Sequence, residues 1–146
     1  MIKKISIEAV KYTAHTLAKE TLNWDEPIPE FDTRYPNVLE SCINTPFQTY
    51  GGKDLYQGLI SKAAILFYLL IKNHPFQNGN KRIAITSLFL FLYINQKWLK
   101  VDSAKLYNFA VWVAQSPTEA KEEVVNYISK FIKQNIIYAK VSNTNT

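Results

Sequence analysis

The two most apolar stretches of the sequence are joined by nine residues, His74-Pro75-Phe76-Gln77-Asn78-Gly79-Asn80-Lys81-Arg82. The first stretch, 55–73, has apolar residues at helical spacing, and Pro75 disfavours helical backbone at the residue before it. Gly79 is free to adopt a positive φ in a turn, and a second apolar helix is expected over 80–96. The sequence therefore predicts a loop between two buried helices, with His74 at the mouth of the loop.

Lys81 and Arg82 fall in the first turn of the second predicted helix. A helix N-terminus already carries partial positive charge, so each cation there is unfavourable by a few tenths of a kcal/mol unless an anion neutralises it. Free amide groups, a glycine that lets a ligand approach the backbone, and neighbouring Lys and Arg side chains together favour a phosphate site. His74 is a candidate general base for chemistry at that phosphate.

These nine residues resemble the signature of the Fic/Doc (death-on-curing) family, H-x-F-x-(D/E)-(A/G)-N-(G/K)-R. Eight of the nine positions agree, and the exception is Asn78, where the family usually has the acidic residue that holds Mg²⁺. Lys81 and Ile85 resemble the Doc branch, because Fic adenylyltransferases have glycine and often a second arginine at these positions. Gly79 and Pro75 look more like Fic. The resemblance extends from about Glu26 to Ile132 and implies an all-α, Fic-type helical domain.

The resemblance implies catalytic roles for His74, Lys81 and Arg82. His74 is similar to the general base that takes the proton from a target hydroxyl as this hydroxyl attacks a nucleotide phosphate. Phe76 is similar to a residue that packs the loop into the core. The implied nucleotide- and phosphate-binding positions, whose backbone amides and charges would stabilise the transferred group, are Asn78, Gly79, Asn80, Lys81 and Arg82.

Three functions are left open by the resemblance. A lysine at position 81 goes with a Doc-like toxin that transfers the γ-phosphate of ATP, or of another nucleoside triphosphate, to a protein hydroxyl, for example on a translation factor. AMP transfer to a hydroxyl is the second function, and a catalytically weak binding or regulatory module of Fic fold is the third. The family also implies Mg²⁺, but Asn78 supplies no carboxylate charge, so metal binding is expected to be weak. No residue is predicted as a metal ligand.

A separate antitoxin protein is implied as a partner. Many Fic proteins carry an inhibitory helix, S/T-x-x-x-E-(G/N), whose glutamate pairs with the second arginine. Segments 16–20 and 118–122 come close to this pattern but lack the final Gly or Asn, and Ile85 occupies the arginine position. An antitoxin segment that docks near residues 74–82 is therefore expected to inhibit the protein.

Residues 45–54 are predicted to form a short β-hairpin, because Phe47 and Thr49 alternate with other residues before a Gly-Gly pair. This is the single β element that the sequence predicts. The predicted hairpin resembles a flap that Fic and Doc proteins carry beside the active-site loop. In the family, this flap holds the target peptide by strand addition. An ordinary glycine-rich turn is the alternative. The target-binding flap residues that the resemblance implies are Gln48, Thr49 and Tyr50.

Composition predicts one domain over residues 1–146, since the 146-residue chain is 47% hydrophobic and has four glycines. Cys42 is the single cysteine and is expected in the core. The apolar run 83–94 is shorter than the roughly 20 residues needed to span a bilayer, and no secretory signal precedes it. A cytoplasmic protein without membrane contact is expected. The net charge of +5 is scattered, so direct nucleic-acid binding is not predicted.

The remaining pattern predicts a total of about six helices. The first is expected over 7–21, with His15 on its polar face or at a cap, and an extended crossover is expected over 23–36. Pro36 should open the next helix. A helix over 102–115 should be followed by another that a capping box at 116–119 begins. Trp98 and Trp112 are expected in the core, and residues 141–146 form a polar tail.

Overall fold

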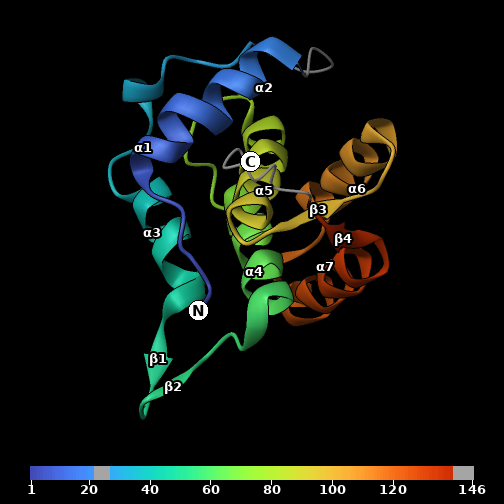
Figure 1. The fold of residues 1–146 in the computed structure, drawn as a ribbon. Coiled ribbons are helices and arrows are strands. Elements are labelled where there is room, and N and C mark those ends of the chain that lie inside the picture. The colour runs from blue at the N-terminus through green and yellow to red at the C-terminus, as the bar shows by residue number, and fades with distance from the viewer. Residues whose placement is uncertain (22–26, 140–146) are drawn as a thin grey trace, which may run out of the picture.

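The computed structural model describes residues 1–21 and 27–139. At its centre, helices α4 (Gly58–Lys72) and α5 (Asn80–Ile94) pack side by side (Figure 1). Residues 62–71 of α4 are all buried, and so are residues 82–88 of α5. The prediction that other helices enclose α5 is confirmed, and α4 is enclosed to the same degree. The predicted polar tail lies outside the described residues.

The N-terminal helix runs along α5 as three consecutive parts, α1 (Ile7–Ala9), a π-helical segment (Val10–Ala14) and α2 (His15–Thr21). The Ser6 hydroxyl caps its start by accepting from the backbone N–H of residue 9 at 3.0 Å. The predicted position of His15 on a polar face or at a cap is wrong, because the side chain is only 5% exposed.

Part of the predicted crossover lies outside the described residues, and its remainder runs from Pro27 to a 3₁₀ turn, Phe31–Thr33. Helix α3 spans Val38–Asn44. The prediction that Pro36 opens this helix is wrong, because Asn37 adopts a left-handed φ of 67° and the helix begins only after it.

The predicted hairpin is confirmed. A 3₁₀ turn, Thr45–Phe47, leads into β1 (Thr49–Tyr50), which pairs antiparallel with β2 (Lys53–Asp54). Lys62 of α4 is 2% exposed and holds the hairpin base. Its Nζ donates to Asp54 Oδ2 at 3.1 Å and to the Tyr56 carbonyl, and it lies 5.3 Å from the centre of the Phe47 ring.

A second antiparallel pair was not predicted. Strand β3 (Lys97–Leu99) follows α5, and β4 (Ile136–Tyr138) follows the last helix. The expectation of a single β element is therefore wrong. Each strand has only three residues, which is too short for a period-2 pattern to stand out in the sequence. The pairing ties the end of α7 back to the end of α5.

Helices α6 (Ser103–Gln115) and α7 (Lys121–Asn135) confirm the last two predicted helices and lie on the side of α4 and α5 away from α1 and α3 (Figure 1). A 3₁₀ turn, Thr118–Ala120, precedes α7. The predicted capping box is wrong, because the Ser116 hydroxyl donates back to the Val113 carbonyl at 2.6 Å and closes α6 instead.

Both tryptophans predicted in the core are exposed instead: 39% of Trp98 and 43% of Trp112 are accessible to solvent. Cys42 is buried as predicted, and burial raises the pKa of its thiol to about 12. Of the helices that the structure describes, none is long and apolar enough to cross a bilayer.

Candidate active site

Asn80, the first residue of α5, pins the loop that joins α4 to α5. Its Oδ1 accepts from the backbone N–H of Phe76 at 2.9 Å, and its Nδ2 donates to the carbonyl of the same residue at 2.8 Å. Phe76 is fully buried, in agreement with its predicted packing role, and Asn80 is 7% exposed. The Asn80 side chain, which was predicted to bind phosphate, therefore bonds to the loop instead. Its backbone amide at the helix start is the group that can face a phosphate.

His74 is exposed and adopts a left-handed φ of 48°, outside the helical region as predicted. Its Nδ1 lies 3.4 Å from Asn80 Nδ2. Because the two contacts with Phe76 fix the orientation of the Asn80 amide, the atom that faces the ring can only donate. In this weak hydrogen bond Nδ1 is the acceptor, so its lone pair lies on the side of the ring that faces Asn80.

Gly79 precedes α5 at a φ of 76°, as the turn prediction requires. A Cβ atom added at this position would lie 2.7 Å from Ile28 Cγ1, so the crossover packs directly against the glycine. A larger residue here would separate the crossover from the loop.

Gly79→Ala is expected to lower the free energy of unfolding by about 1–3 kcal/mol, since it adds left-handed strain and a steric overlap. Urea denaturation measures this loss. The double variant Gly79→Ala/Ile28→Ala should lose less than the sum of the two single losses, because removing the Ile28 side chain relieves the overlap. Additive losses would show that the close approach has no energetic effect.

Lys81 and Arg82 lie in the first turn of α5, as predicted. Lys81 is half-buried, whereas Arg82 is 4% exposed and its Nη2 donates to the Ala18 carbonyl of the N-terminal helix at 2.7 Å. One turn further on, the Thr86 hydroxyl donates to the Ala14 carbonyl, also at 2.7 Å. The guanidinium therefore brings positive charge to the helix start and also joins α5 to α2.

His15 is a residue of this neighbourhood that sequence reasoning missed. Its ring centre lies 5.7 Å from that of Phe76 and 5.5 Å from that of Phe31. Its Nε2 donates to the Pro29 carbonyl at 2.9 Å. Burial lowers the pKa of His15 below its usual value, against the opposing hydrogen bond to Pro29. A sign was present in the sequence, because His15 is adjacent to Ala14 on the apolar side of its helix.

The crossover, and not the hairpin, borders the loop. The backbone N–H of Tyr35 donates to the Pro75 carbonyl at 2.9 Å, in addition to the contact at Gly79. The base of the hairpin instead meets the far end of α5, where the rings of Phe47 and Phe91 are 6.2 Å apart.

The structure does not bring Gln48, Thr49 and Tyr50 to the loop. Their hairpin precedes the first residue of α4, whereas His74 follows its last residue, and a 15-residue helix is about 22 Å long. The predicted place of the flap beside the loop is therefore wrong, because an unbroken helix separates the two segments (Figure 1).

Asn78 is exposed on the loop. Among the described residues, no group of three or more His, Cys, Asp or Glu side chains gathers where it could hold a metal ion. The neutral amide of Asn78 therefore does not fit a Mg²⁺ ion that the protein holds by itself.

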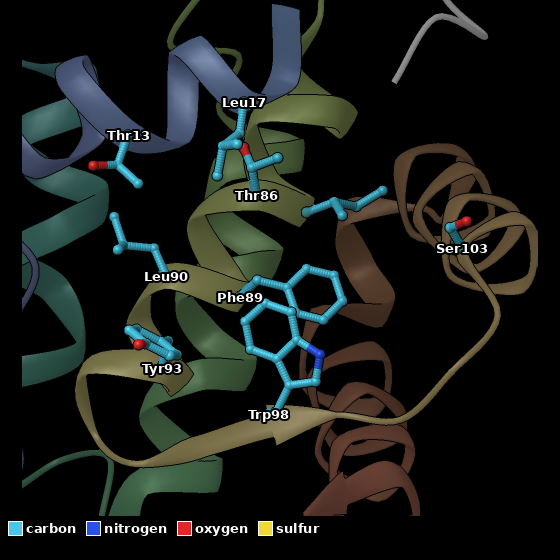
Figure 2. A pocket seen from close by; sticks show the side chains of 9 residues that line it. Thr13, Leu17, Thr86, Phe89, Leu90, Tyr93, Trp98 and Ser103 are labelled. Atoms are coloured by element: carbon cyan, nitrogen blue, oxygen red, sulfur yellow. The ribbon is translucent and has the colours of Figure 1, made fainter. Parts of the chain in front are cut away.

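An apolar groove of about 400 Å³ lies between the N-terminal helix, α5 and β3. Figure 2 shows Thr13 and Leu17 on one side, and Phe89 and Trp98 on the other, with ring centres 4.5 Å apart. It begins at Ile85, in the second turn of α5. The other residues that line the groove are Thr86, Leu90, Tyr93 and Ser103.

Part of this chain is similar in sequence to known proteins. The sequence profile of the Fic/DOC family matches residues 4–92. Toxin Doc of Mycolicibacterium smegmatis is 37% identical over 73 residues, which are 50% of this chain and 56% of that protein. The match thus spans about half the length of that relative. No solved structure matches the chain significantly. Given the family profile over more than half of its length, the chain belongs to the Fic/DOC family.

Proposed function

We propose that this protein is a Doc-like toxin that transfers the γ-phosphate of ATP, or of another nucleoside triphosphate, to a hydroxyl group of a target protein. The observation that carries the proposal is the loop at residues 74–79. There, Asn80 links the exposed imidazole of His74 to the start of α5, where the first backbone amides of the helix and two cations lie. This arrangement supplies a base and a phosphate site next to each other.

In the proposed reaction, the target hydroxyl replaces Asn80 Nδ2 as the partner of His74 Nδ1 and gives its proton to the lone pair of that nitrogen. The hydroxyl oxygen forms a bond to the γ-phosphorus, and the bond from this phosphorus to the bridging oxygen breaks. The products are a phosphoprotein and a nucleoside diphosphate. The amides of Gly79 and Asn80 and the charges of Lys81 and Arg82 stabilise the transferred phosphate. Because no group of carboxylates gathers there among the residues that the structure describes, Mg²⁺ would be held largely by the nucleotide.

Lys81 supports γ-phosphate transfer over AMP transfer. It lies in the first turn of α5, where a lysine acts as a point charge on a phosphate, and it is the residue that separates the Doc branch from Fic adenylyltransferases. The partial match to a protein named Toxin Doc supports the same branch. The proposed target, a protein such as a translation factor, and a cytoplasmic site of action follow from this branch alone.

We further propose that a separate antitoxin inhibits the protein through the groove shown in Figure 2. The groove starts in the second turn of α5, and its rim exposes 42% of Leu17, 45% of Tyr93 and 39% of Trp98. An amphipathic segment with an apolar face fits such a groove. From there it can reach the approach to His74.

Asn78→Asp is expected to raise the affinity for Mg²⁺ in the presence of nucleotide. The carboxylate adds a full negative charge and a better oxygen ligand at an exposed position. The measurement is the Mg²⁺ concentration that gives half-maximal transfer, which should fall. Asn78→Ser, which also lacks charge, serves as the control. An unchanged Mg²⁺ dependence in the Asp variant would show that residue 78 does not face the nucleotide's metal.

The proposed chemistry is tested by identifying the nucleotide product after incubation of the purified protein with a lysate and ATP. Kinase activity releases ADP in step with protein modification. Release of pyrophosphate would instead establish AMP transfer. The absence of both, with nucleotide still bound, would establish a binding module.

A further inference from the structure

The outer face of α6 and α7 carries an exposed aromatic ridge. Trp112 is 43% exposed and Tyr127 is 55% exposed, and their rings meet edge to face with centres 5.6 Å apart. Phe109 stacks on Trp112 at 5.6 Å and on Phe131 at 4.2 Å, which ties the ridge to the half-buried layer below. Rigid aromatic side chains expose a large apolar area at low entropic cost, and such patches mark interaction surfaces.

Two hollows flank this ridge, and both use Trp112 and Tyr127 as a wall. The hollow on one side, of about 350 Å³, includes Pro117 and Glu123. The hollow on the other side, of about 400 Å³, includes Lys130. The ridge therefore stands between a hollow that bears a carboxylate and a hollow that bears an ammonium group.

The charges follow one face of α7. Glu123, Tyr127 and Lys130 are four and then three residues apart, so they lie along the same side of the helix with the tyrosine in the middle. Glu123 and Lys130 are both exposed. If two copies of α7 meet antiparallel around a two-fold axis near Tyr127, each Glu123 faces the Lys130 of the other copy. The same operation brings the aromatic ridges of the two copies together at the axis.

We infer that this face of α6 and α7 forms a symmetric homodimer, in which the occupant of each surface is a second copy of the chain. A two-fold interface must be complementary to itself, and the positions of Glu123 and Lys130 give this surface that complementarity in charge. Oppositely charged pairs that flank an apolar seam also set the orientation of helices in coiled coils. The inference does not depend on the proposed enzymatic activity.

Sedimentation velocity over about 1–500 µM protein tests the dimer. The mass should rise with concentration from the 16.9 kDa monomer toward twice that value. Glu123→Lys and Lys130→Glu should each raise the dimer dissociation constant about tenfold, because each change creates two like-charged pairs across the axis. The double variant Glu123→Lys/Lys130→Glu should return it to within about threefold of the original value, because both pairs are restored with reversed signs.

Glu122→Lys is the matched control, since it makes the same change in net charge next to the proposed face and should leave the dissociation constant unchanged. Trp112→Ala should weaken the dimer at least about tenfold, because it removes the centre of the ridge. A monomer at every concentration would overturn the inference. So would a dimer in which the double charge reversal fails to recover what the single reversals lose.

Discussion

Replacing His74 with asparagine should lower the rate of phosphate transfer by about 10²–10⁴-fold, the contribution typical of a general base. Asparagine is the informative substitution because it tolerates the left-handed φ of 48° at this position better than alanine does. The variant therefore removes the proton acceptor and leaves the loop intact. The initial rate of label transfer from γ-labelled ATP to protein measures the effect.

The control for this variant is its stability. His74 is exposed and its contact with Asn80 is long, at 3.4 Å, so the free energy of unfolding should change by no more than about 0.5 kcal/mol. A transfer rate within threefold of the unmodified protein would exclude His74 as the base. The loop would then be a phosphate site whose chemistry, if any, comes from other residues.

Asn80→Ala should have the largest effect on stability, a loss of about 3–5 kcal/mol in the free energy of unfolding. The change leaves the backbone N–H and the carbonyl of Phe76 without their partners, and both are buried. An unpaired buried polar group costs about 1–3 kcal/mol, and here two are created at once. Urea denaturation followed by circular dichroism measures the loss.

Asn80→Asp is the matched variant, since a carboxylate still accepts from the Phe76 N–H but cannot donate to its carbonyl. It should lose about half as much stability as the alanine variant. A loss below about 1 kcal/mol for Asn80→Ala would show that the loop is held by its other contacts. These are the packing of Phe76 against His15 and the hydrogen bond from Tyr35 to Pro75.

The central helices and the loop could be predicted because their signals are local. Apolar residues at helical spacing define α4 and α5, Pro75 ends the first helix near His74, and Gly79 supplies the positive φ before the second. The hairpin was predictable for the same reason, since its Gly-Gly turn directly joins the two strands in the sequence.

The surroundings of the loop could not be predicted, because they depend on contacts between distant parts of the chain. The Arg82 guanidinium bonds to a carbonyl 64 residues earlier, and the crossover reaches the loop through Ile28 and Tyr35. The place of the hairpin depends on the direction of α4, which no residue type reveals. The family resemblance placed the hairpin beside the loop that follows α4, whereas the hairpin lies at the other end of this helix.

The sequence also could not predict which individual aromatic residues are buried. Tryptophan is a residue type expected in a core. Trp98 and Trp112, however, each line a groove or hollow that forms only when separate elements pack. The short strands β3 and β4 pair over a separation of almost 40 residues, so neither strand predicts its partner. Only the folded structure therefore shows that the two tryptophans are exposed. Their exposure makes them candidate residues of interaction surfaces.

Two parallel incubations of the purified protein with a lysate, one with ATP labelled at the α-phosphate and one with ATP labelled at the γ-phosphate, test the central proposal most directly. Protein should acquire label from the γ-phosphate alone, and the His74→Asn variant should lose that labelling. Protein labelled from the α-phosphate, or γ-labelling that persists in the variant, would contradict the account.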